Sequence, residues 1–294
     1  MITTPGKDLR KAIQAESPLQ VVGVTNPYHG VMAKSAGFIA LYLSGSGVAT
    51  ASYGLPDLGM TTLDNVLEDV RRVVTAVDLP LLVDVDTGWG GAFMIARTMK
   101  EMARAGAAGV HIEDQVQDKR CGHRPGKQIV STVEMQDRLK AAADAKEYED
   151  FVLMARTDAI ASEGVDAAVE RAVAYVESGA DMLFAEAVTE LADYKKFREA
   201  TGVPVLANLT EFGQTQAFTL DELAGADVDI ALYPLTAFRA ANKAAENVFR
   251  ILRTEGTQSK IINELQTREE LYAYIDYQAY ESKLDQLFST DSDL

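Results

Sequence analysis

Eight apolar runs rich in aliphatic and β-branched residues recur along the chain, and most are followed by a stretch of helical character. Such near-continuous hydrophobicity is typical of strands buried on both faces of a parallel sheet. The runs cover residues 19–24, 38–43, 80–85, 109–113, 151–156, 182–186, 203–208 and 230–233, and the intervening helices are predicted at 61–77, 92–105, 133–146, 165–177 and 191–200. Eight β/α units in 294 residues predict an α/β fold, a (β/α)8 TIM-type barrel, with a doubly wound open sheet as the alternative.

Short glycine motifs mark the joints between helices and strands. They read SAGF at 35–38, RAGAAGV at 104–110, ESGADML at 177–183 and LAGADVD at 223–229. In each, we expect the helix to end at a glycine in the left-handed conformation. Polar residues at Thr62 and Asn65, and the acidic Asp166, are expected at helix starts. The repetition favours one regular β/α unit.

No linker rich in proline, glycine or serine divides the chain, so residues 1–294 are predicted to form one barrel domain with a C-terminal helical tail at about 255–294. Helices are expected at 237–254 and at roughly 261–288. The tail carries more apolar and aromatic surface than a lone helix leaves in water. We expect it to pack on a neighbouring subunit. Packing on its own barrel is the alternative.

Charge and composition exclude several classes of function. Lys and Arg number 28 against 44 Asp and Glu, so the formal net charge is −16. An anionic surface disfavours nucleic acid and anionic membranes as partners. No apolar run approaches the roughly 20 residues of a membrane helix, and the first residues lack a signal-peptide pattern. With one cysteine, Cys121, no intrachain disulfide forms, which favours a reducing compartment and a cytoplasmic protein.

Polar side chains follow most of the apolar runs, where a barrel places its active site. Asp84 and Asp86 lie two residues apart in VDVDTGWGG, so in a strand both carboxylates face one side. With Glu113 they supply three hard oxygen donors, which suit Mg²⁺ or Mn²⁺. The alternative is that one aspartate caps a helix or pairs with an arginine. Further strand-end residues are Tyr42, Ser44, Asp114, Arg156, Asp158, Glu186, Asn208, Thr210, Glu211 and Arg239.

A glycine-rich turn and a basic loop are the most specific local motifs. The turn Ser44-Gly-Ser-Gly is too short for a P-loop, but its N–H groups suit a carboxylate. Residues 119–127 (KRCGHRPGK), here called the cysteine loop, place Cys121 and His123 among four basic residues. Positive charge around a thiol favours its thiolate and lets it exchange a proton. A lone cysteine is otherwise usually an inert buried residue.

These residues resemble the isocitrate lyase and phosphoenolpyruvate mutase superfamily over nearly the whole chain. The motifs that carry the resemblance are YLSGSG, GLPDLG, LLVDVDTGWG, HIEDQ, KRCGHRPGK, MARTDA, LANLTEFG and ALYPLTAFRA. KRCGH is typical of the lyases rather than the mutases, and the chain length favours the branch that acts on 2-methylisocitrate. The resemblance implies a cytoplasmic homotetramer, with the last helix exchanged between subunits, and a required Mg²⁺.

The resemblance also implies roles for individual residues. Asp84 and Asp86 hold the metal, with Asp57 and Glu113 acting mostly through water. Cys121 is the catalytic acid/base, and Tyr42 and His123 are further catalytic candidates. The implied substrate contacts are Ser44, Gly45, Ser46, Gly122, Arg156, Glu186, Asn208, Thr210, Arg239 and Arg268.

The expected reaction is cleavage of the tricarboxylate 2-methylisocitrate to pyruvate and succinate, as in propionate breakdown through the methylcitrate cycle. Mg²⁺ would acidify the substrate hydroxyl, and Cys121 would protonate the succinate enediolate. Isocitrate lyase, which forms glyoxylate, is the nearest alternative, because one methyl group is worth only about 1–3 kcal/mol. A barrel that binds a carboxylate without turnover is an alternative of another class.

Overall fold

The computed structural model describes residues 4–124 and 126–288. Pro125 of the cysteine loop and residues 289–294 of the expected tail lie outside this range. The chain divides into two compact units, Met1–Phe238 and Arg239–Leu294. The boundary falls inside helix α11 (Thr236–Glu255), ahead of the tail that we expected from about residue 255.

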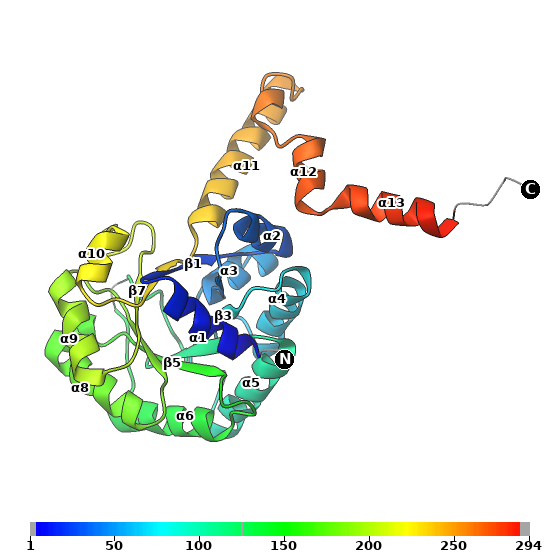
Figure 1. Ribbon diagram of the computed structural model, residues 1–294. Helices are drawn as coiled ribbons and strands as arrows, with labels where there is room; N and C mark the ends of the chain where they lie inside the picture. The colour runs from blue at the N-terminus through cyan, green and yellow to red at the C-terminus, as the bar shows by residue number, and fades with distance from the viewer. Residues whose placement is uncertain (1–3, 125, 289–294) are drawn as a thin grey trace, which may run out of the picture. The chain divides into compact units, whose positions relative to one another are not determined.

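The first unit is a closed barrel of eight parallel strands in the order β1 to β8, ringed by helices (Figure 1). This confirms the predicted (β/α)8 fold over the open sheet. Every predicted strand forms, and the largest difference is at β2, which begins at Leu41 rather than at residue 38. The strands are β1 Leu19–Gly23, β2 Leu41–Leu43, β3 Leu81–Asp84, β4 Gly109–Glu113, β5 Val152–Thr157, β6 Met182–Ala185, β7 Val205–Asn208 and β8 Ile230–Tyr233.

The helices of this unit follow the predicted order. Thr62 and Asn65 form a reciprocal capping box at the start of α4, and Asp166 lies in the first turn of α8. The helices are α1 Pro5–Ala15, α2 Pro27–Ser35, α3 Gly45–Gly47, α4 Leu63–Ala76, α5 Ala92–Ala105, α6 Thr132–Asp144, α7 Ile160–Glu163, α8 Val165–Glu177, α9 Leu191–Thr201 and α10 Leu220–Gly225, and a π-helical turn η1 covers Val48–Ser52.

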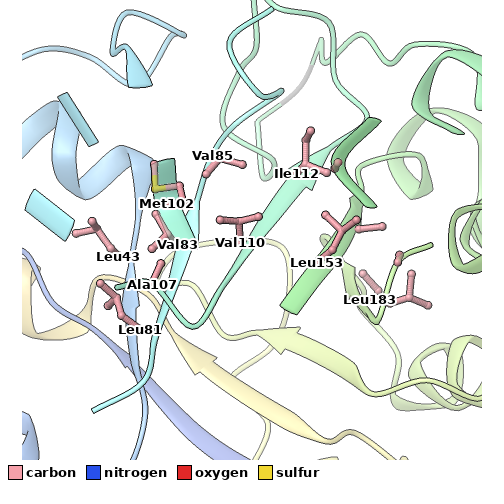
Figure 2. Close-up of a cluster of buried hydrophobic side chains, with 14 of the residues drawn as sticks. Leu43, Leu81, Val83, Val85, Met102, Ala107, Val110, Ile112, Leu153 and Leu183 are labelled. Carbon is pink, nitrogen blue, oxygen red and sulfur yellow. The ribbon is translucent and has the colours of Figure 1, made fainter. Parts of the chain in front are cut away.

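Alternation along the strands divides the core into two clusters. Val83, Val110 and Leu153 belong to the cluster that the strands share with the surrounding helices (Figure 2). Their neighbours Leu82 and Val152 belong to a second cluster, which contains strand residues and Leu9 of α1. Successive side chains of a strand point to opposite faces. The second cluster therefore fills the barrel interior, and both faces of the sheet are buried.

In three of the four glycine motifs, the glycine that follows the helix has the left-handed conformation that we predicted. Gly37, Gly106 and Gly179 have φ values of 96°, 98° and 109°. The fourth prediction is wrong, because Gly225 is the last residue of α10 and does not have a positive φ. Asp227 instead adopts φ 56°. Aspartate tolerates the left-handed region better than most side chains, so the left-handed residue of this motif lies two positions after the end of the helix.

The second unit contains the rest of α11, a 3₁₀ turn η2 (Ile262–Glu264), α12 (Arg268–Tyr274) and α13 (Tyr277–Phe288). The single helix expected at 261–288 is therefore broken into three pieces. Asp276, with φ 52°, separates α12 from α13. Within the described residues, no helix is long and apolar enough to cross a membrane.

Gly23 lies where β1 meets β8 to close the barrel, and a Cβ there would lie 1.7 Å from the backbone oxygen of Pro234. We expect Gly23→Ala to lower the free energy of unfolding by at least about 1–3 kcal/mol, because the strands must separate to admit the methyl group. Gly225→Ala is the control, since a Cβ there meets nothing within 4 Å. Urea denaturation measures both variants. Equal midpoints would show that the closure is not tightly packed.

Candidate active site

At the carboxyl ends of the strands, the side chains that point into the barrel are polar. Tyr42, Met154 and Phe184 face the barrel interior, and the residues two positions further along each strand lie on the same side. The structure thus brings together six buried polar residues that the sequence analysis selected. They are Ser44, Asp84, Glu113, Arg156, Glu186 and Asn208.

The Arg156 guanidinium is the centre of this group. Its Nε lies 2.9 Å from Asp158 Oδ2 and 3.3 Å from Glu113 Oε2, and its Nη2 lies 3.0 Å from Glu186 Oε2. Its planar head stacks 5.0 Å above the Phe184 ring. All four ionic side chains are buried. Burial favours the neutral form of a carboxyl group, so each carboxylate here depends on its cationic partners.

The two glutamates respond differently to the same arginine. Burial raises the pKa of Glu113 well above its usual value, although Arg156 and Lys119 oppose the rise. For Glu186, burial also acts to raise the pKa, but Arg156 and His123 outweigh it and lower the pKa. Beside the same guanidinium, the pKa of Glu186 is therefore lowered and that of Glu113 is raised. Asn208 Nδ2 donates to both Glu186 oxygens, at 3.3 and 3.4 Å.

Asp84 and Asp86 both lie beside Gly45, although strand alternation does not bring them together. Asp86 lies beyond the end of β3 with φ 49°, and its N–H donates to Asp84 Oδ1 at 3.1 Å. A Cβ on Gly45 would lie 3.0 Å from Asp84 Oδ2 and 3.1 Å from Asp86 Oδ1. The Gly45 N–H donates to Asp84 Oδ2 at 3.0 Å. The glycine-rich turn thus binds a carboxylate of its own chain.

Lys119 reaches into this carboxylate pair. Its ammonium lies 2.8 Å from Asp57 Oδ1 and forms a short ion pair with Asp86. Burial, Asp84 and Asp57 raise the pKa of Asp86 to about 6 against the pull of Lys119. Burial alone would raise the pKa of Asp84 as well, but His111, Lys119 and Arg156 outweigh it and lower the pKa to about 2.

The predicted metal ligands do not form a ready cluster. Among residues 4–124 and 126–288, no three His, Cys, Asp or Glu side chains are placed to hold a metal ion together. Asp57 and Asp86 share Lys119, and Glu113 pairs with Arg156. The expectation of three convergent donors, Asp84, Asp86 and Glu113, is therefore not met directly. Mg²⁺ usually keeps several waters and takes one or two carboxylates, which this arrangement allows.

Tyr42 and His111 lie side by side beneath Asp84. The Tyr42 hydroxyl and His111 Nε2 are hydrogen-bonded at 2.9 Å, and Nε2 lies 3.6 Å from Asp84 Oδ1. Burial, and next the nearby Asp84 charge, raise the pKa of Tyr42 well above its usual value. Tyr42 thus keeps its proton at neutral pH and acts as a hydrogen-bonding group.

The cysteine loop is held over the strand ends by several contacts. Lys127 Nζ donates to Gly122 O at 2.5 Å and to Asp158 Oδ1 at 2.9 Å. His123 Nε2 lies 2.5 Å from Glu186 Oε1, and its Nδ1 accepts the Gln214 N–H at 3.0 Å. Both ring nitrogens of His123 are therefore engaged with protein groups. A catalytic role for His123 stays a prediction.

Cys121 itself is exposed. It lies with Asp57, Arg120 and Arg124 around a surface depression of about 600 Å³. The sequence analysis correctly separated this thiol from a buried, inert cysteine. Its place beside Asp57 links the cysteine loop to the Asp84–Asp86 region through Lys119.

The remaining selected residues lie at the edge of this group or in the other unit. Gly122 is buried, whereas Ser46 and Thr210 are half-buried. Arg239 and Arg268 belong to the second unit, on α11 and at the start of α12, so their substrate contacts stay predictions. Sequence reasoning did not assign Gln115, Lys127 or Asp158 a role. The sequence could have indicated Asp158, because it lies two residues after Arg156 and its side chain therefore points to the same side of the sheet.

A closed parallel barrel with buried charged residues at the carboxyl ends of its strands is typical of an enzyme. The family model for phosphoenolpyruvate phosphomutase matches residues 9–253, and the chain belongs to this family. It is 61% identical over 99% of its length to the 2-methylisocitrate lyase of Vibrio cholerae serotype O1, covering 97% of that protein.

Two solved structures extend the comparison. A crystal structure of 2,3-dimethylmalate lyase, described as a PEP mutase/isocitrate lyase superfamily member, matches with a TM-score of 0.89 and 31% identity over 99% of this chain and 98% of that one. Phosphonopyruvate hydrolase in complex with oxalate and Mg²⁺ matches with a TM-score of 0.84 and 28% identity over 98% of this chain and 100% of that one.

Burial lowers the pKa of His111 to about 4, below its value of roughly 6.5 in an unfolded chain. The unfolded state therefore binds the extra proton first, and the stability contributed by neutral His111 is lost as the pH falls from about 6.5 through 4. We expect the stability advantage of the natural protein over His111→Gln to shrink across this range. Urea denaturation at about pH 7, 5.5 and 4.5 measures it. A constant difference would contradict the lowered pKa.

Proposed function

We propose that this protein is a carbon–carbon lyase that cleaves 2-methylisocitrate to pyruvate and succinate, the last step of propionate breakdown through the methylcitrate cycle. The observation that carries the proposal is the 61% identity to a 2-methylisocitrate lyase over 99% of the chain. The site geometry supports it, because a tricarboxylate requires several cationic and N–H partners. Arg156 and Lys119 supply such cations at the carboxyl ends of the strands.

The chain's own residues suit a retro-aldol cleavage. Arg156, Asn208 and the turn at Ser44 bind and orient the carboxylates of the substrate. The bond between the carbinol carbon and the succinate carbon breaks as the hydroxyl proton passes to water, and the electron pair of that bond moves onto the succinate fragment as an enediolate. The Cys121 thiol gives its proton to that carbon. Arg156 stabilises the developing negative charge.

The donor set also fits a divalent cation, for which we propose Mg²⁺, with Mn²⁺ as a substitute. Glu113 Oε1 is a buried carboxylate oxygen without a hydrogen-bond partner, and Asp84 and Asp86 offer further hard oxygens. Asp84 and Asp86 would hold the ion, with Asp57 and Glu113 contributing through water. When bound, the metal polarises the hydroxyl of the substrate and favours loss of its proton.

A coupled assay tests the activity. Purified protein is stripped with a chelator, and pyruvate or glyoxylate formation is followed from 2-methylisocitrate and from isocitrate, with and without added Mg²⁺. We expect turnover only with metal, and a preference for 2-methylisocitrate of about tenfold or more, because one methyl group that a site accommodates is worth about 1–3 kcal/mol. A preference for isocitrate would overturn the substrate. Turnover of neither would overturn the proposed function.

Replacing Cys121 with serine should remove the proton donor but leave substrate binding intact. We expect kcat of Cys121→Ser to fall by on the order of 10²–10⁴, while 2-methylisocitrate still binds in calorimetry. Ser162 offers a control, since its hydroxyl bonds only locally to Ala159 O, and Ser162→Ala should keep normal kcat. Near-normal turnover of Cys121→Ser would remove Cys121 from the acid/base role.

We further propose that residues 1–294 act as one barrel domain whose helical tail is exchanged within a cytoplasmic homotetramer. No residue of α12 or α13 is buried, and α13 presents Leu284, Leu287 and Phe288 at exposures of 55%, 63% and 74%. Such an apolar face favours a protein partner. We expect Leu284→Glu with Leu287→Glu to reduce the mass measured by light scattering. A natural protein that runs as a monomer would contradict this proposal.

A further inference from the structure

Two buried polar side chains hold the backbone on either side of Cys121. On the preceding side, Gln115 Nε2 donates to Arg120 O at 2.9 Å, and the Arg120 N–H donates to Gln115 Oε1 at 3.0 Å. The side-chain amide thus pairs with both backbone groups of one residue. Gln115 is 1% exposed, and it lies two residues after Glu113, the last residue of β4. The strand therefore fixes the position of Arg120.

On the following side, Lys127 holds the carbonyl of Gly122. Its ammonium donates to Gly122 O at 2.5 Å and to Asp158 Oδ1 at 2.9 Å, and its side chain is 4% exposed. Asp158 in turn binds Arg156 through both carboxylate oxygens. Lys127 therefore connects the residue after Cys121 to the arginine at the centre of the site.

Asp158 is itself held by a hydrogen bond to a neighbouring strand end. Its N–H donates to Asp114 Oδ1 at 2.8 Å, and Asp114 Oδ2 accepts from the Tyr175 hydroxyl of α8 at 2.9 Å. Asp114, at the end of β4, is fully buried. The anchor for Lys127 is thus part of the rigid barrel.

The backbone at Gly122 is closely packed against neighbouring side chains. A Cβ on Gly122 would lie 2.4 Å from Arg156 Nη2, 2.6 Å from Glu186 Cγ and 2.8 Å from Asp158 Oδ1. The Gly122 backbone therefore rests directly on the charged residues of the strand ends. Cys121 has its own side chain exposed, so its place is set by its neighbours rather than by packing of the thiol.

We propose that Gln115 and Lys127 are positioning residues that together hold the backbone on both sides of Cys121, so that the thiol can reach a substrate bound at Arg156. This inference rests on the proposed lyase function for its kinetic part. Proton donation requires a group within hydrogen-bond reach, and a displacement of about 1 Å can cost on the order of 10²-fold in rate. Neither residue need touch the substrate to act in this way.

The first test measures the backbone itself and needs no substrate. The variants are Lys127→Met, Gln115→Met and the conservative Lys127→Arg. Hydrogen exchange followed by mass spectrometry reports on the peptide around residues 117–124 in the otherwise complete protein. We expect exchange there to be about tenfold faster in both Met variants, because each loses backbone hydrogen bonds to a buried group. Lys127→Arg should restore part of the protection.

Matched controls remove the same kinds of contact far from the cysteine loop. Lys146 Nζ pairs with Asp181 Oδ2 at 3.0 Å, just ahead of β6, and Gln136 Nε2 donates to Ala174 O at 3.4 Å between α6 and α8. Lys146→Met and Gln136→Met should leave exchange at 117–124 and turnover unchanged. If they match the loop variants, a general loss of stability explains the effect and the proposal fails.

The second test separates binding from proton transfer. We expect kcat for 2-methylisocitrate to fall by on the order of 10- to 10²-fold in Lys127→Met and Gln115→Met while KM changes little, because the carboxylate-binding residues stay in place. Normal exchange and normal kcat in both variants would overturn the proposal. If the natural protein turns over no substrate, the proposed function fails, and the exchange result alone decides whether these residues hold the loop. If Lys127→Met does not fold, Gln115→Met carries both tests.

Discussion

Buried charge at Arg156 is the constraint on which the rest of the site depends. Its guanidinium is 8% exposed, and an unpaired ion at such a place costs several kcal/mol. Three carboxylates pair with this cation. They belong to Glu113 of β4, to Asp158 at the end of β5 and to Glu186 at the end of β6. Because the same carboxylates also bind Lys127 and His123, one buried cation orders both the strand ends and the cysteine loop.

The carboxyl ends of the strands hold buried cations, although the chain as a whole is strongly anionic. The protein carries a net charge of −16, yet Lys119 and Arg156 are buried at the carboxyl ends of the strands. Each of these cations is paired with a carboxylate of the chain. Both cations are therefore desolvated and held in place before any substrate carboxylate arrives.

Much of the site was predictable, although not always for the right reason. Asp84 and Asp86 do meet at one point, but a left-handed turn at Asp86 brings them together. The sequence analysis placed four basic residues of the cysteine loop around Cys121 and His123. In the structure, Lys119 enters the Asp57–Asp86 pair and Lys127 binds Asp158. Local periodicity carries no information about which charge in a loop meets which strand end.

The sequence by itself determined the barrel, the strands that close it and the polar residues at their carboxyl ends, because these follow from hydrophobic periodicity and from the chemistry of short motifs. Only the tertiary structure decided the pairings: Lys127 with Asp158, Gln115 with the Arg120 backbone, and Tyr42 with His111. Tyr42 and His111 are 69 positions apart in the chain. Such contacts form when the barrel closes, and burial then makes an unpaired polar group too costly to leave.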